Sequence, residues 1–105
     1  MMKWKDERPI RKNNTVLREI EGESLLVPIA QFDDPFLILY TLNDAGRFIW
    51  DIIGTSCSAG EIVKKLMEQY EVDEKCAQKD VEMFLSLLHD KDLISFNKVE
   101  NDRNM

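Results

Sequence analysis

The chain has 105 residues, which is enough for one compact domain with polar ends. Hydrophobic residues make up 44% of the chain, a share that is typical of a globular protein and argues against intrinsic disorder. Twenty acidic residues outnumber fourteen basic ones and give a net charge of −6. Because this charge repels a phosphate backbone, it disfavours a nucleic-acid partner.

The inventory of reactive side chains is small. Cys57 and Cys76 match no metal-ligand spacing, and His89 is the only histidine. The sequence contains no catalytic pair of carboxylates and no phosphate-binding loop, so we expect no enzymatic activity, no metal and no cofactor. No apolar run approaches the roughly 18 residues of a membrane-spanning helix, and the polar first residues lack the apolar region that is typical of a signal peptide. We therefore predict a cytoplasmic protein that has no membrane contact.

The first part of the chain has the pattern of a small sheet. Residues 1–14 are polar and of mixed charge, and we predict a flexible segment there. Alternating apolar and polar residues predict strands at 16–20 and 24–29, with Gly22 in the turn between them. The apolar run at 36–42 predicts a third strand. Short connections between sequential strands favour an antiparallel meander.

After the predicted sheet, the apolar period lengthens to about 3.6 residues, which indicates helices. Asn43 or Asp44 would cap the first helix, and Gly54 would end it. Ser58 and Glu61 have the spacing of a capping box, which predicts the start of a second helix that ends after Tyr70.

Asp73 would cap a third helix that reaches about Lys91, and the sequence at 93–96 predicts a short last strand. We expect a polar tail at 97–105. The predicted domain therefore spans 15–96. Its class is α+β, and a three-stranded antiparallel sheet followed by three helices is close to a winged helix-turn-helix.

The predicted third strand lacks the usual protection of an edge strand. It has no charged residue and no proline between Phe36 and Leu42, whereas the opposite edge carries Arg18, Glu19 and Glu21. Such an edge needs a cover. Another part of the chain, a second copy in a homodimer, or a bound peptide would each provide one.

The predicted third helix is apolar over an unusually wide arc. One face is expected in the core, and it consists of Ala77, Val81, Phe84, Leu85 and Leu88. A second stripe consists of Cys76, Met83 and Leu87, with Asp80 beside it and Lys79 at its rim. Either a neighbouring helix covers this stripe, or the stripe and the bare strand enclose a groove. A groove of this kind binds an extended peptide as an added strand, with charged rim residues favouring particular partners.

Four stretches, in this order and spacing, resemble a known family: "VLREIEGESLLVP" at 16–28, "LNDAGRFIWDII" at 42–53, "SAGEIVKKLMEQYEVD" at 58–73, and "KDVEMFLSLLHDKDLI" at 79–94. This sequence is similar to the PqqD-like family, the relatives of coenzyme PQQ synthesis protein D. The acidic segment 29–36 and the basic residues before Val16 depart from the family pattern, so PQQ synthesis itself is not implied.

The resemblance implies a recognition element for precursors of ribosomally synthesised, modified peptides. In such modules, the leader of the precursor peptide adds a strand beside the third strand and against the third helix. The module then presents the peptide to a modifying enzyme, commonly of the radical SAM type. Transferred by position, the peptide-binding residues are Leu37, Ile38, Leu39 and Tyr40 on the strand and Cys76, Lys79, Asp80, Met83 and Leu87 on the helix.

The alternative is a winged-helix DNA-binding regulator. Its recognition helix would present basic or amide side chains to base edges. The predicted third helix instead exposes residues of mixed charge: Glu74, Lys75, Gln78, Lys79, Glu82 and Asp90. The sequence leaves two roles open for Trp50: it would either fill a gap between the sheet and the helices or form part of a surface that binds a partner.

Overall fold

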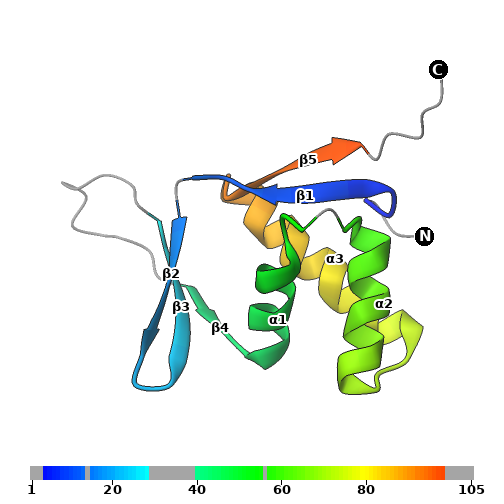
Figure 1. Cartoon of the computed structure of the whole chain (residues 1–105), viewed down its shortest axis with the longest axis horizontal. Coiled ribbons are helices and arrows are strands. Elements are labelled where there is room, and N and C mark those ends of the chain that lie inside the picture. The colour runs from blue at the N-terminus through cyan, green and yellow to red at the C-terminus, as the bar shows by residue number, and fades with distance from the viewer. Residues whose placement is uncertain (1–3, 14, 29–39, 56, 99–105) are drawn as a thin grey trace.

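The protein is described by a computed structural model that covers residues 4–13, 15–28, 40–55 and 57–98 (Figure 1). Its class is α+β, as predicted. The elements in chain order are β1 (Glu7–Arg11), β2 (Thr15–Ile20), β3 (Glu23–Pro28), β4 (Tyr40–Leu42), α1 (Asp44–Ile52), α2 (Ala59–Tyr70), α3 (Glu74–Asp90) and β5 (Ile94–Lys98).

The strands β2, β3 and β4 form the predicted antiparallel sheet, with β3 in the centre. Ile20 pairs with Glu23, so the hairpin between β2 and β3 has a two-residue loop. Both loop residues have positive φ, 52° at Glu21 and 83° at Gly22. A two-residue loop with two positive φ angles matches the right-handed twist of the flanking strands, which is why glycine is favoured at this turn.

The strand β4 lies at the edge of the sheet. Its residues pair with β3, and Thr41 lies opposite Leu25. In the described part of the chain, no strand pairs with the other side of β4. The third strand was predicted from Phe36. Residues 36–39, which include the predicted site residues Leu37, Ile38 and Leu39, lie outside the described residues.

A second sheet, formed by β1 and β5, differs from the sequence prediction (Figure 1). The two strands pair antiparallel from Glu7 opposite Lys98 to Arg11 opposite Ile94. Residues 7–11, which were expected to lie in a flexible segment, therefore form a strand, and the last strand extends two residues into the predicted tail. The physical reason is apolar burial: Pro9 is fully buried and Trp4 is only 8% exposed. In the sequence, Trp4 lies between Lys3 and Lys5, and Pro9 follows Arg8. Because of these charged neighbours, the sequence pattern did not indicate a buried strand.

The three helices begin at the predicted caps. Asn43 accepts a hydrogen bond from the Gly46 amide, and Asp73 accepts one from the Cys76 amide, each at 2.8 Å. Ser58 and Glu61 form both hydrogen bonds of the predicted capping box. These side chains satisfy amides that have no partner inside their own helix.

The core lies where the helices, the larger sheet and the β1–β5 sheet meet. Its largest fully buried side chains are Leu26, Ile49, Ile53, Ile62, Leu66, Val81, Leu85, Leu88, Ile94 and Pro9. Trp50 is 3% exposed, and the Arg11 guanidinium lies 5.4 Å from the centre of its ring. This position answers the open question about Trp50: the ring is part of the core, and Arg11 of β1 lies near it.

None of the helices in the described ranges has both the length and the apolar character needed to cross a bilayer.

Candidate functional site

Two neighbouring hollows lie between α3 and the segment that joins β4 to α1. The smaller has a volume of about 300 Å³, and its lining includes Leu26 and Thr41 from the sheet and Leu88 from α3. The larger is an open hollow of about 1040 Å³ that follows α3. Both hollows share Asn43, Gly46, Phe84 and Leu87. We refer to the two together as the α3 groove.

The strand side of the α3 groove is formed by the end of β4 and the first turn of α1. Thr41 is exposed, whereas Leu42 is buried. Asn43 caps α1, and Gly46 follows in its first turn. A Cβ atom at Gly46 would lie 3.2 Å from the Asn43 Oδ1 atom and 3.6 Å from the Leu42 Cβ atom. A residue without a side chain therefore keeps this side of the groove open.

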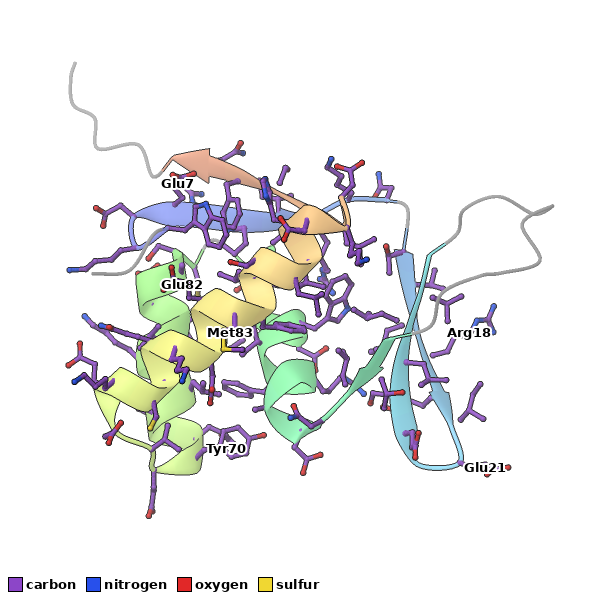
Figure 2. The ribbon with its side chains drawn as sticks, turned by 180° about the vertical axis from the view of Figure 1, so that it is seen from behind. Glu7, Arg18, Glu21, Tyr70, Glu82 and Met83 are labelled. Carbon is purple, nitrogen blue, oxygen red and sulfur yellow. The ribbon has the colours of Figure 1, made fainter. Side chains whose placement is uncertain are left out.

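The helix side of the α3 groove contains four of the five predicted helix residues: Lys79, Asp80, Met83 and Leu87. Met83 is 62% exposed and Leu87 is 42% exposed, which are high values for large apolar side chains. In Figure 2, α3 lies nearest to the viewer, and the labelled Met83 lies on this helix. The sequence left open whether a neighbouring helix covers the apolar stripe that contains Met83 and Leu87. In the described structure, neither α1 nor α2 buries these two side chains.

Cys76, the fifth predicted helix residue, is exposed but does not line either hollow. It lies in the first turn of α3, where Asp73 is the cap. The hydrogen bond from the Cys76 backbone lowers the pKa of the Asp73 carboxyl, and the nearby Asp73 raises the pKa of the Cys76 thiol. A raised pKa keeps the sulfur protonated at neutral pH, which disfavours a nucleophilic role.

Of the predicted strand residues, Tyr40 begins β4 and its backbone pairs with Leu26. The other three fall within residues 29–39, which the structure does not describe. The predicted strand side is thus placed through Tyr40 alone.

Several lining residues were not in the predicted site: Thr41, Asn43, Ala45, Gly46, Ile49 and Phe84. Phe84 was assigned to the core by its spacing, and it does contact the core, but it is only half-buried and also lines both hollows. Gly46 did carry a signal, since a glycine inside a helix costs about 1 kcal/mol relative to alanine and needs a local reason.

In the described ranges, no group of three or more histidine, cysteine, aspartate or glutamate side chains is placed to hold a metal ion. The α3 groove presents exposed apolar side chains beside a strand edge, with a few charged residues in its lining.

An α+β module whose edge strand is unpaired on one side within the described ranges, and lies beside a helix-lined groove, has the architecture of a peptide-recognition domain. The family model of Coenzyme PQQ synthesis protein D (PqqD) matches residues 37–94, more than half of the chain. The chain belongs to the PqqD family, which confirms the resemblance seen in the sequence.

Two solved structures share this fold. One is "TbiB1 in Complex with the TbiA(beta) Leader Peptide", with a TM-score of 0.65 and 22% identity over 90% of this chain and 99% of that chain. The other is "Lasso peptide synthetase B1 complexed with the leader peptide", with a TM-score of 0.65 and 17% identity over 86% of this chain and 98% of that chain. No curated protein sequence matches this chain.

Proposed function

We propose that this protein is a non-catalytic adaptor that binds the leader segment of a ribosomally synthesised precursor peptide. The peptide adds a strand to the open edge of β4 and lays alternate side chains into the α3 groove. The adaptor then presents the peptide to a modifying enzyme. The observation that carries this proposal is the juxtaposition of an edge strand with exposed Met83 and Leu87.

The physical argument has two parts. Backbone groups along an unpaired edge supply hydrogen bonds to any extended peptide, and hollows beside the edge select side chains. A micromolar complex requires about −8 kcal/mol, which a short added strand and two or three buried side chains can provide. The solved relatives were both determined with a leader peptide, and membership of the PqqD family supports the same ligand class.

The modifying enzyme is proposed to be of the radical SAM type, which is the common partner of this family. The cytoplasm is the proposed location, because Cys57 and Cys76 are both free thiols.

A homodimer joined through β4 would hide the same edge that a peptide needs. Light scattering with and without peptide separates these two states.

The charge of the α3 groove disfavours duplex DNA as its ligand. Two basic and three acidic residues line it, Lys75, Lys79, Asp80, Glu82 and Asp90, so their sum is −1. A surface that binds phosphates needs an excess of positive charge. No comparison supports the DNA-binding alternative.

The test is a selection of strand-forming peptides from a random library of 12-residue sequences displayed on phage, with the wild-type protein as bait. A selected peptide is then titrated into ¹⁵N-labelled protein. We expect the largest amide shifts at Thr41 and Leu42 and along α3 near Met83. We also expect slower hydrogen exchange in β4. Shifts confined to β2 or to the β1–β5 sheet would refute the proposed site, and failure to select any peptide would refute the proposed function.

A further inference from the structure

We propose that Asp80 selects a leader segment in which a lysine or arginine side chain stands two residues from the apolar side chain that enters the smaller hollow. This inference rests on the proposed function and names the specificity of the same groove. It is carried by the position of one carboxylate opposite an uncharged strand side of the α3 groove.

Helical spacing places Asp80 beside the hollow. Asp80, Phe84 and Leu87 stand at positions i, i+4 and i+7 of α3, so they share one face of the helix. Phe84 and Leu87 both line the smaller hollow. Asp80 therefore lies about one turn, or about 6 Å along the helix axis, before Phe84. It stands at the end of the smaller hollow that is nearer to the start of α3.

The opposite side of the α3 groove offers Asp80 no counter-charge. Its described lining residues are all uncharged: Thr41, Leu42, Asn43, Ala45, Gly46 and Ile49. The ion pairs among the described residues are Lys12–Asp92, Glu19–Arg47 and Arg47–Asp51, and none of them involves Asp80. A basic side chain on a bound peptide would supply the missing partner, and an acidic one would be repelled.

Lys79 does not cancel this preference. It is one residue before Asp80 and is therefore rotated about 100° around the helix axis, where it shares a face with Met83 and Ser86. Lys79, Met83 and Ser86 line only the larger hollow, as does Lys75 one turn earlier, whereas the face of Asp80 continues through Phe84 and Leu87 into the smaller hollow. The Lys79 charge therefore lies farther around the helix from the smaller hollow than the Asp80 charge does, and screening by salt weakens it more over the longer distance.

The spacing of the selected residues follows from the geometry of a strand. Side chains on one face of a strand repeat every two residues, or about 6.6 Å. The rise of about 6 Å from Asp80 to Phe84 is close to one such step. The expected peptide pattern is therefore a basic residue, one residue of any type, and a large apolar residue, in either chain direction.

The test uses the same random 12-residue phage library with four baits: wild type, Asp80→Asn, Asp80→Lys and the matched control Glu68→Lys. Glu68 is an exposed carboxylate of α2 that lines neither hollow. With wild type, we expect lysine or arginine at the predicted position to be enriched about fivefold over aspartate and glutamate, the size of a partly exposed ion pair. The enrichment should disappear with Asp80→Asn and reverse to acidic residues with Asp80→Lys. Glu68→Lys should select like wild type.

Circular dichroism of each bait establishes that it is folded before selection. Peptides that bind the α3 groove without a basic preference, or with the same preference for Asp80→Lys as for wild type, would overturn this inference and leave the proposed function intact. A library that yields no binder for the wild type would overturn both. The enrichment should also fall between about 50 and 500 mM salt, because screening weakens a partly exposed ion pair.

Discussion

Trp4 and Phe96 stack with their ring centroids 4.4 Å apart and their planes 15° from parallel. This contact joins the two ends of the described chain and holds β1 against β5. His89 at the end of α3 lies beside both rings, 5.8 Å from Trp4 and 5.4 Å from Phe96. The N-terminal strand is therefore part of the core, and removing its anchor should be costly.

Trp4→Ala tests this role. Truncation of a buried tryptophan leaves a cavity and typically costs about 3 kcal/mol or more, so we expect a comparable loss in the free energy of unfolding. Urea denaturation followed by circular dichroism gives the value. The control Asn13→Ala changes an exposed side chain and should stay within about 0.5 kcal/mol of wild type. Equal stability of all three proteins would show that β1 is not docked.

Met83→Glu tests the helix side of the α3 groove. Because Met83 is 62% exposed, the substitution should change the unfolding free energy by less than about 0.5 kcal/mol. A buried charge without a partner in the complex should weaken peptide binding at least about tenfold. Fluorescence anisotropy with a labelled peptide from the library measures the affinity.

Ile20→Glu is the matched control, since Ile20 is an exposed apolar residue, 52% exposed, on the opposite edge of the same sheet. We expect it to bind the peptide like wild type. If Ile20→Glu weakened binding and Met83→Glu did not, the peptide would be using β2 instead of β4.

Gly46→Ala tests whether the missing side chain matters for binding. The added methyl group would lie next to Leu42 and Asn43, which line the smaller hollow, and we expect roughly three- to tenfold weaker binding. The stability should change by less than about 1 kcal/mol, because the gain in helix propensity offsets crowding of the Asn43 cap. Chemical denaturation and anisotropy separate the two effects, and unchanged affinity would remove Gly46 from the site.

Ser58→Ala tests the capping box of α2. The Glu61 amide donates to the Ser58 hydroxyl at 3.2 Å, and the Ser58 amide donates to the Glu61 carboxylate at 2.8 Å. Loss of the hydroxyl should cost about 1 kcal/mol. Glu61→Gln keeps a side chain that can accept the reciprocal bond and should cost less than half as much. Peptide affinity should be unchanged in both variants, since neither residue lines the α3 groove.

Asp73→Asn tests the pH dependence of the α3 cap. Hydrogen bonding to Cys76 lowers the pKa of the folded Asp73 carboxyl below its ordinary value of 3.8. A depressed folded pKa contributes stability that is present above the unfolded pKa and is lost as the pH falls through the folded one. Asparagine also caps a helix, but it lacks the negative charge that the helix N-terminus favours and does not titrate there. The stability advantage of wild type over Asp73→Asn should therefore shrink below about pH 4 in denaturation series. A constant difference across pH 2–6 would contradict this assignment.

Sequence alone determined the elements whose causes are local. The caps at Asn43, Ser58 and Asp73 act on amides within three residues, and the turn at Gly22 depends on two backbone angles. The apolar stripe that contains Met83 and Leu87 likewise followed from helical spacing alone. These features could be predicted because each one needs only its neighbours in the chain.

Tertiary structure decided the features whose partners are far apart in the chain. The strand β1 exists because Trp4 and Pro9 find a buried place against β5, a gain in apolar burial that no local pattern among charged residues displays. Gly46 and Phe84 belong to one groove only because the fold brings the first turn of α1 opposite α3. Local propensities set which elements form, whereas the burial of apolar surface between distant segments sets which of their faces meet.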